Sequence, residues 1–274
     1  GPMLAVLPSL ELAKRTSRGR LDPLIADSAA LRERVNPARS RDAGNSMLSK
    51  EFPGGILVLT GANSATGLRS MPARYVFLDE VDAYPASADE EGDPVTLAEA
   101  RTTTFSHRRK VFMVSTPTIR GLSRIEREFE ASDQRRYFVP CHHCGHRQWL
   151  QFERLRWGKG KPETAMYHCE GCEKPIAEHH KTQMLANGEW RATAVSANPH
   201  AIGFHQFARG VSQMVDSHTA HSVQIAPHHH SAALLLVGDQ STSTFQTRSR
   251  APGFMRGDTN TLGATSSMVD DKKP

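Results

Sequence analysis

Residues 74–80 read RYVFLDE, an apolar run that ends in two adjacent carboxylates, Asp79 and Glu80. Residues 110–115 read KVFMVS, a second apolar run that ends in a hydroxyl side chain. Short, nearly continuous apolar runs rich in β-branched and aromatic residues are typical of parallel strands that are covered on both faces. These two stretches therefore predict two buried strands of a parallel sheet.

Further strands and helices are predicted around these two. Residues 3–7 (MLAVL) and 55–60 (GILVLT) have the same apolar character. Helical patterns lie between the apolar runs, at residues 10–31 with an interruption at Pro23, at 94–104 and at 123–132. Strands that alternate with helices over residues 1–135 indicate repeated βα units, and hence an α/β fold.

The overall composition is that of a globular protein of one or two domains, with 274 residues, 38% hydrophobic and 23% charged. The longest apolar run, residues 232–237, is far shorter than the roughly 20 residues that span a bilayer, and the N-terminus has no signal-peptide pattern. We therefore expect a cytoplasmic protein without a membrane partner. The net charge of +5 is compatible with a polyanionic partner but does not require one.

The last quarter of the chain differs from the rest. All three tryptophans and all four tyrosines precede residue 208, whereas residues 208–274 contain no Glu, Trp or Tyr and are rich in Ser, Thr, His and Gly. Without apolar periodicity such a segment cannot offset the entropy lost on ordering. We predict a disordered tail over 208–274, which is either the product of a frameshifted or recombined gene end or a natural disordered tail. His228–His230, within it, imply no function.

The two acids after the first quoted strand are candidates for nucleotide chemistry. The carboxyl ends of the strands in a doubly wound sheet form its ligand crevice. In a nucleotide hydrolase, Asp79 would hold Mg²⁺, directly or through water, and Glu80 would orient and deprotonate the attacking water. The alternative is that both acids only cap the next helix. The next strand ends in Ser115 and Thr116, whose hydroxyls would reach the same metal or water, and this favours the nucleotide hypothesis.

The four cysteines form a second constellation, Cys141-x-x-Cys144 and Cys169-x-x-Cys172, with 24 residues between the pairs. In a reducing compartment this spacing predicts a zinc ribbon rather than disulfides. Four thiolates leave no open coordination position, so the zinc would be structural. The nearby His142, His143 and His146 are not needed as ligands.

The segment between the cysteine pairs is basic and aromatic. It carries Arg147, Arg154, Arg156, Lys159 and Lys161 together with Trp149, Phe152 and Trp157. These side chains either contact DNA by charge neutralisation and stacking, or the aromatic ones form the small core of the ribbon. The acidic stretch 89–93 lacks a regular ligand spacing, so we interpret it as a solvated loop rather than a cation site.

Four segments together carry a resemblance to a known family. They are GGILVLTGANSATGLRSMPARYVFLDEVDAYP (54–85), EGDPVTLAEARTTTF (91–105), VSTPTIRGLSRIEREFEASDQRRYFVPCHHCGH (114–146) and GEWRAT (188–193). Over residues 1–205 the chain resembles the GpA-like large terminase subunit of tailed phages. The resemblance implies a P-loop NTPase-like, mostly parallel sheet, with Asp79 and Glu80 as the Walker B acids and Ser115-Thr116-Pro117 as the motif that couples hydrolysis to movement.

The same resemblance implies an activity and its partners. Members of this family have an ATPase motor that drives double-stranded DNA into a procapsid, and a C-terminal nuclease. The implied cofactors are Mg²⁺ with ATP, and the implied partners are DNA, the small terminase subunit and the portal of the procapsid, in the cytoplasm of a bacterial host. Arg69 matches the place of a functional arginine near the nucleotide, which makes it a candidate contact to phosphate or DNA. The alternative is an ordinary solvated arginine.

One family motif has no match in this sequence. No G-x-x-x-x-G-K-[ST] occurs, and the nearest glycine-rich stretch, Gly61–Gly67, is followed by Leu68 and Arg69. In the family the Walker A loop lies upstream of the matching region and the nuclease downstream of it. We therefore expect a fragment that hydrolyses ATP poorly on its own.

These expectations divide the chain into four parts: a partial ATPase domain (1–136), a zinc ribbon (137–180), the start of a linker to a nuclease (181–207) and the tail (208–274). Two functional hypotheses remain open. The chain is either part of the packaging motor ATPase, or a non-catalytic prophage remnant that binds DNA or terminase partners through its ribbon and sheet.

Overall fold

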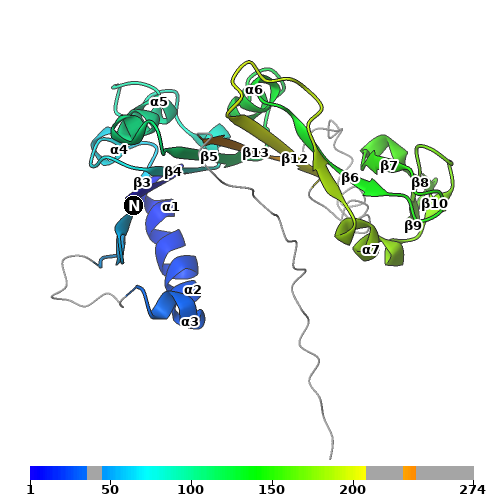
Figure 1. Ribbon diagram of the computed structural model, residues 1–274, viewed down its shortest axis with the longest axis horizontal. Coiled ribbons are helices and arrows are strands. Elements are labelled where there is room, and N and C mark those ends of the chain that lie inside the picture. Colours follow the sequence, from blue (N-terminus) through cyan, green and yellow to red (C-terminus); the bar gives the residue numbers. More distant parts are fainter. Residues whose placement is uncertain (36–44, 208–230, 239–274) are drawn as a thin grey trace, which may run out of the picture. The chain divides into compact units, whose positions relative to one another are not determined.

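The structure, a computed structural model, describes residues 1–35, 45–207 and 231–238 (Figure 1). The described residues all belong to one compact unit, residues 1–243. They form a mixed α/β structure with one large sheet and one small one. The strands of the large sheet follow the order β11-β6-β12-β13-β5-β4-β1-β3-β2, and β7 pairs with β6 off this path.

The predicted parallel strands are confirmed. They are β1 (Met3–Leu7), β3 (Gly55–Gly61), β4 (Tyr75–Asp79) and β5 (Lys110–Ser115), which pair in parallel in the order β3-β1-β4-β5. A short strand, β2 (Ser49–Phe52), adds to β3 in antiparallel fashion. The register sets Phe77 opposite Phe112, and their rings stack with centroids 5.3 Å apart.

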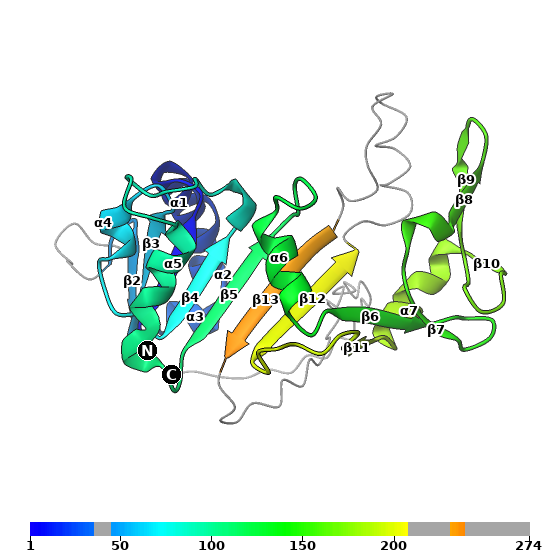
Figure 2. The same ribbon diagram turned by 90° about the horizontal axis from the view of Figure 1, so that it is seen from above.

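Helices cover both faces of this parallel region (Figures 1 and 2). On one face, α4 (Ala65–Leu68), α5 (Pro94–Glu99) and α6 (Arg124–Ala131) contribute to a core with Leu4, Val6, Val76 and Leu78. On the other face, α1 (Leu10–Thr16) packs through Ala13 against Ala5, Leu7 and Leu59. Successive residues of β1 thus face opposite layers, as expected for a strand with period two that is buried on both sides.

The helical stretch predicted over 10–31, with an interruption at Pro23, forms as several short segments. After α1 come a π-helical turn (Ser17–Leu21), α2 (Asp22–Asp27) and α3 (Ala29–Arg32). Pro23 lies in the first turn of α2, where its missing N–H costs no helical hydrogen bond. Two 3₁₀ segments occur elsewhere in this region, a single turn at Val81–Ala83 and a longer one at Ala100–Phe105.

The ribbon region follows α6. Its strands are β6 (Arg135–Pro140) and β7 (Arg147–Trp149) in the large sheet, and β8 (Leu155–Gly158), β9 (Lys161–His168) and β10 (Pro175–Ile176) in a separate three-stranded sheet. A short 3₁₀ turn, Phe152–Arg154, lies between β7 and β8, and another, Glu178–His180, leads from β10 into α7 (Lys181–Ala186).

The segment expected to begin a linker contributes strands to the large sheet. β11 (Glu189–Arg191) pairs with β6 in antiparallel fashion, and β12 (Ala201–Phe207) pairs with it in parallel. Trp190 explains this, because its ring packs against both Tyr137 of β6 and Phe204 of β12, with centroids 5.0 Å away in each case. A half-buried aromatic cluster therefore ties residues 189–204 to the sheet.

The prediction that residues 208–274 contain no strand is wrong for one segment. Ser231–Gly238 (SAALLLVG) forms β13, which pairs in antiparallel fashion with β5 on one side and β12 on the other. The physical reason is that this segment holds the longest apolar run of the chain, and backbone pairing is available to it along both of its edges. The other residues of 208–274, including His228–His230, lie outside the described residues.

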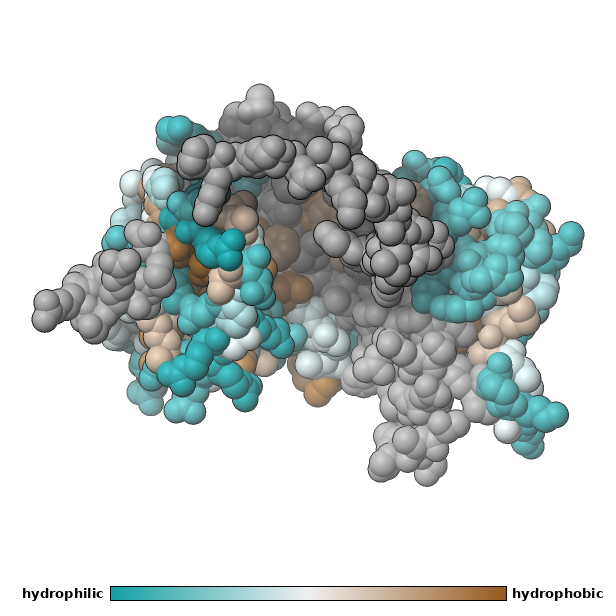
Figure 3. Space-filling view, turned by 90° about the horizontal axis from the view of Figure 1, so that it is seen from below, coloured by the Kyte–Doolittle hydropathy of each residue, from teal (hydrophilic) through white to brown (hydrophobic). Residues whose placement is uncertain are grey.

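Among the described residues no helix is long and apolar enough to cross a membrane. Hydrophilic side chains dominate the described surface in the view of Figure 3, with hydrophobic residues in smaller areas.

Candidate nucleotide edge and metal centre

The acidic pair lies at the carboxyl end of β4. Asp79 is the last residue of the strand, and Glu80 has a left-handed backbone with φ 54° and ψ 54°. For a residue other than glycine this conformation costs about 1–2 kcal/mol, and such residues concentrate at functional sites. Glu80 thereby turns the chain out of the strand and into the 3₁₀ turn Val81–Ala83.

The structure brings Glu80 and Ser115 together. β4 and β5 are neighbours, and Ser115 ends β5 one residue beyond Val114, the partner of Asp79. The Ser115 hydroxyl oxygen accepts a hydrogen bond from the Asp82 N–H (3.2 Å) and lies 3.5 Å from Glu80 Oε2, to which the hydroxyl donates. Thr116 is exposed at the same strand end. Glu80 and Ser115, which were predicted separately at the ends of two strands, are thus in direct hydrogen-bond contact.

Asp79 is half-buried beneath this turn. Burial raises the pKa of its carboxyl above the ordinary value, against the opposing charge of Arg20 and a backbone hydrogen bond. Nearby, the hydroxyl of Tyr84 donates to the Val6 carbonyl oxygen (2.8 Å). Burial raises the pKa of Tyr84 strongly, and the charge of Asp79 adds to the effect, so the phenol stays neutral. Tyr84 therefore fastens the turn after β4 to the neighbouring strand β1.

Sequence reasoning missed Asp82, which has the densest set of contacts at this edge. Its Oδ2 accepts hydrogen bonds from the N–H (3.0 Å) and the hydroxyl (3.1 Å) of Thr118, and its Oδ1 accepts one from the Ile125 N–H (3.0 Å). Burial raises the pKa of Asp82, but hydrogen bonds from Ser123, Ile125 and Thr118 outweigh it and hold this pKa below its usual value. The signal in the sequence was a third acid two residues after Glu80.

The contacts of Asp82 join three segments: the turn after β4, the loop after β5 and the first turn of α6. Arg124 adds a second link, because its Nη2 donates to the Pro85 carbonyl oxygen (3.0 Å) and lies 3.0 Å from an oxygen of Asp93. The beginning of α6 is therefore held on the strand edge that carries Glu80 and Ser115.

Arg69 lies at the end of α4 and forms an ion pair with Glu91, with both side chains nearly half exposed. The acidic stretch 89–93, which we interpreted as a solvated loop, makes further specific contacts. Asp89 accepts a hydrogen bond from the Ala65 N–H (2.9 Å), and Asp93 caps α5 through the Thr96 N–H (3.0 Å). These acids hold α4 and α5, and one of them neutralises the candidate arginine.

The predicted clustering of the four cysteines is confirmed, since their sulfur atoms all lie within 4.8 Å of one another. The Sγ atoms of Cys141 and Cys172 are 3.9 Å apart, and those of Cys144 and Cys169 are 3.7 Å apart. A tetrahedral ion with metal–sulfur bonds of about 2.3 Å needs sulfur separations of about 3.8 Å. These two separations match that geometry, and all four sulfurs lie close enough together to share one zinc ion.

Each cysteine pair lies in a tight turn between two strands. The first turn joins β6 to β7 and is closed by the Cys141 N–H on the His146 carbonyl oxygen (2.8 Å), and the second joins β9 to β10 and is closed by the Cys169 N–H on the Lys174 carbonyl oxygen (3.1 Å). Gly145 (φ 73°) and Glu173 (φ 55°) occupy the same left-handed position, directly after the second cysteine of each pair.

Backbone N–H groups point at the sulfurs, as expected for thiolate ligands. The N–H groups of His143 and Gly171 lie 3.3 Å from the sulfurs of Cys141 and Cys169. Burial raises the pKa of Cys141 to about 12, so this thiol keeps its proton at neutral pH unless a cation replaces it. Burial also raises the pKa of Cys169, but hydrogen bonds from Cys172, Cys141 and Gly171 outweigh it and lower this pKa to about 7. The thiols of the cluster therefore differ in how readily they lose a proton to a metal ion.

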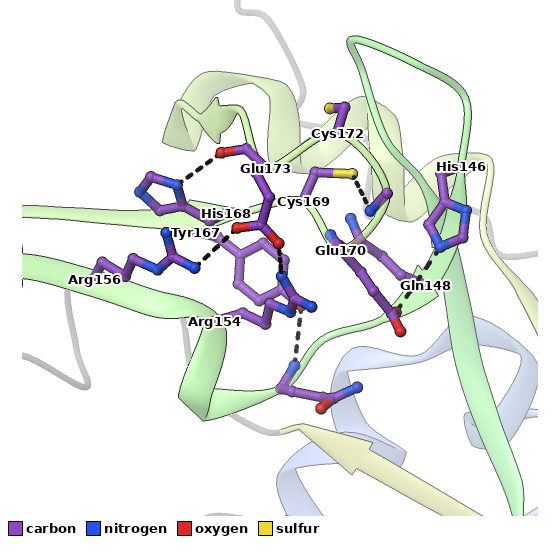
Figure 4. Close-up of polar contacts among 12 residues, drawn as sticks. His146, Gln148, Arg154, Arg156, Tyr167, His168, Cys169, Glu170, Cys172 and Glu173 are labelled. Carbon is purple, nitrogen blue, oxygen red and sulfur yellow. Dashed lines mark hydrogen bonds and ion pairs between the residues drawn. The ribbon is translucent and has the colours of Figure 1, made fainter.

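The neighbouring histidines lie outside the four-sulfur cluster. The ring of His142 stacks on that of His180, with centroids 3.5 Å apart, and His143 Nε2 contacts the Pro175 carbonyl oxygen at 2.9 Å. His146 Nε2 lies 3.9 Å from a carboxylate oxygen of Glu170 (Figure 4).

The aromatic residues of the ribbon are divided between its interior and its surface. Phe152 packs against the ribbon core, and Trp149 packs edge-on against Phe138. Trp157 is 42% exposed. Among the basic residues, Arg154 and Arg156 both pair with Glu173 (Figure 4), and Arg147 contacts Glu189, whereas Lys159 and Lys161 are exposed at the β8–β9 turn.

Comparison with known proteins identifies relatives. Residues 1–190 match the family described as phage terminase large subunit gpA, ATPase domain. The chain is 30% identical over 193 residues to the terminase large subunit of Enterobacteria phage P21, covering 67% of this chain and 29% of that protein. It is 28% identical over 172 residues to the terminase large subunit of Escherichia phage lambda, covering 60% of this chain and 27% of that protein.

The match thus spans less than a third of the length of either relative. No solved structure matches the chain significantly. The family match covers both the strand edge with Glu80 and Ser115 and all four cysteines. The chain therefore belongs to the gpA-type family of phage terminase large subunits.

Proposed function

We propose that this chain forms part of the ATPase of a DNA-packaging motor, which couples ATP hydrolysis to the movement of double-stranded DNA into a procapsid. The observation that carries the proposal is the contact between Glu80 and Ser115 at the ends of adjacent parallel strands. A carboxylate held by the next strand is suited to sense the difference between nucleoside triphosphate and diphosphate.

Each predicted residue has a role in this proposal. Asp79 holds Mg²⁺ with ATP, and Glu80 orients the attacking water. Ser115 and Thr116 relay the state of the nucleotide to the loop that Asp82 holds. Arg69 leaves its ion pair with Glu91 to bind a phosphate group of the nucleotide or of DNA. The small terminase subunit and the portal are the proposed protein partners, as the family implies, in the cytoplasm of a bacterial host.

The nucleotide site also needs a phosphate-binding loop, for which the sequence has no G-x-x-x-x-G-K-[ST] motif. The lysine and backbone amides of such a loop hold the β- and γ-phosphates. We propose that the P-loop NTPase-like site is completed by a segment other than these 274 residues, and that this chain alone binds ATP weakly.

The four cysteines are proposed to hold one structural Zn²⁺. The ion would join two turns that are 28 residues apart in the sequence, from Cys141 to Cys169, and would stabilise a module with a small core. Because four thiolates close the coordination sphere, we assign the ion no catalytic part.

Calorimetric titration with ATP tests the motor proposal. Weak binding that depends on Mg²⁺ is expected for the chain, and Asp79→Asn should remove the Mg²⁺ dependence. Asp27→Asn, at an exposed acid on α2, is the matched control and should behave as the parent chain. Absence of Mg²⁺-dependent binding in the parent chain would favour the other hypothesis, a non-catalytic remnant that binds only DNA or terminase partners.

A further inference from the structure

We propose that Gln148 is a positioning residue for the four-sulfur site, and that it holds the two cysteine turns where their sulfurs can share one metal ion. This inference rests on the metal binding proposed above and deepens it.

The need for such a residue follows from how the site is built. Each turn is closed by its own backbone hydrogen bonds and supplies two of the four sulfurs. The positions of two sulfurs within one turn are therefore fixed locally. The distance from one turn to the other is not, since β6–β7 and β9–β10 belong to different sheets. Contacts that run from turn to turn must set this distance before a metal binds.

His143 makes one such contact, to the Pro175 carbonyl oxygen at 2.9 Å, and Gln148 makes another. It lies on β7 opposite Val139, and its side chain is almost fully buried, with 1% exposed. Its Oε1 accepts a hydrogen bond of 2.6 Å from the Glu170 N–H. Glu170 directly follows Cys169 in the second turn, so a side chain after the first cysteine pair holds the backbone between the second pair (Figure 4).

The other half of the same amide supports a positioning role. Nε2 of Gln148 is buried and has no hydrogen-bond partner among the described residues. Buried side-chain donors are nearly always paired, and an apolar side chain of similar size would fill this space without an unpaired donor. Core packing therefore does not explain why an amide stands at this position. The hydrogen bond from the Glu170 N–H to its oxygen does explain it.

A further contact shows how closely the two turns approach. A Cβ atom on Gly171 would lie 2.8 Å from Cγ of the His146 ring, so only glycine lets this ring pack against the second turn. The Gly171 N–H in turn points at the sulfur of Cys169 (3.3 Å). A small shift between the turns therefore moves a ligand sulfur and its hydrogen bond together.

The test is metal binding by the full chain with Gln148→Leu, compared with the parent chain and with Gln183→Leu. Gln183 is exposed on α7 and provides the same substitution away from the site. Co²⁺ is titrated into metal-free protein while the visible bands of tetrahedral thiolate-bound Co²⁺ are recorded. Zn²⁺ affinity is measured by competition with a chelator. We expect about 10–100-fold weaker Zn²⁺ binding and altered Co²⁺ bands for Gln148→Leu, and parent behaviour for Gln183→Leu.

The outcomes separate the inference from the proposal on which it rests. If the parent chain takes up neither Co²⁺ nor Zn²⁺, the metal proposal fails and this inference with it. If the parent chain binds both metals and Gln148→Leu has the same affinity and the same bands, only the role of Gln148 is refuted. Lower thermal stability without a change in bands or affinity would make Gln148 a packing residue and would also refute it.

A second variant decides the matter if Gln148→Leu does not fold. Gln148→Asn keeps the carbonyl oxygen and the NH₂ group of the amide but shortens the side chain by one methylene. Its oxygen therefore does not reach the Glu170 N–H. It should give the same direction of change in affinity and bands. Parent-like Co²⁺ bands and Zn²⁺ affinity in folded Gln148→Asn would overturn the inference.

Discussion

One carboxylate oxygen of Asp82 accepts two hydrogen bonds from the same residue, Thr118, one from its N–H (3.0 Å) and one from its hydroxyl (3.1 Å). The other oxygen holds the Ile125 N–H at the start of α6. A single acid after β4 thus fixes the loop that follows Ser115, the residue that contacts Glu80. The hydrogen bonds of Asp82 therefore connect the strand edge to α6, in addition to the covalent loop between β5 and α6.

Replacing Asp82 should therefore destabilise the chain in a manner that depends on pH. We expect Asp82→Ala to lower the free energy of unfolding at pH 7 by about 1–3 kcal/mol, because two backbone N–H groups lose a charged acceptor. The pKa of Asp82 is lower in the folded chain than its ordinary value of 3.8. Its stabilising effect is therefore complete above that value and is lost as the pH falls through the folded pKa. Urea unfolding at pH 7 and at pH 3 measures both effects.

The matched control for this experiment is Asp27→Ala, which removes an exposed acid at the end of α2. It should change the free energy of unfolding little at either pH. An Asp82→Ala variant as stable as the parent chain at pH 7 would contradict the role we assign to the Thr118 and Ile125 contacts.

Metal analysis should find close to one zinc per chain in protein purified without added metal. Cys141→Ser combined with Cys169→Ser should abolish retention, because it removes one ligand from each turn. His142→Ala should retain the ion, since this side chain lies outside the four-sulfur cluster. A zinc content near zero in the parent chain, or full retention in the double variant, would show that the cluster is not the zinc site.

The isolated chain should hydrolyse ATP at a rate close to background. Positioning and charge neutralisation of the β- and γ-phosphates supply most of the catalysis of phosphoryl transfer, and the sequence lacks the lysine motif for both. Phosphate release is measured with the parent chain and with Glu80→Gln, and no difference between them is expected. Robust turnover that disappears in Glu80→Gln would prove this wrong and would place a complete site within these residues.

Truncation tests the strand that the sequence analysis missed. A chain that ends at Phe207 lacks β13, and both β5 and β12 then lose a hydrogen-bonding neighbour. We expect its melting temperature to lie on the order of 5 °C or more below that of a chain that ends at Gly238. Equal melting temperatures would show that β13 adds nothing to the sheet and would restore the original interpretation of this segment as a tail.

The parallel strands and the cysteine site were predictable because their signals are local. Each of β1, β3, β4 and β5 is a short apolar run, and the four cysteines lie at spacings typical of zinc knuckles. Buried strands need this composition wherever they lie in the sheet, so no knowledge of tertiary contacts was required.

The features that were missed depend on partners far away in the sequence. Asp82 and Thr118 are 36 residues apart, and Gln148 and Glu170 are 22 residues apart, so no local pattern predicts either contact. β13 was missed because we judged its apolar run by the polar residues around it. The left-handed backbone of Glu173 was not predicted, because the residue itself is not a glycine. Its equivalent in the first cysteine turn, Gly145, carries the usual signal for this conformation.

The left-handed backbone of Glu80 lowers the stability of the fold at the position that carries the proposed catalytic carboxylate. Glycine adopts a φ of 54° without steric cost, so Glu80→Gly would relax the turn while removing the carboxylate that contacts Ser115. A laboratory selection for thermostability alone would therefore enrich a variant without the proposed catalytic group. Selection for the proposed motor activity would have to retain a residue that folds less favourably, so the two selections would favour different residues at position 80.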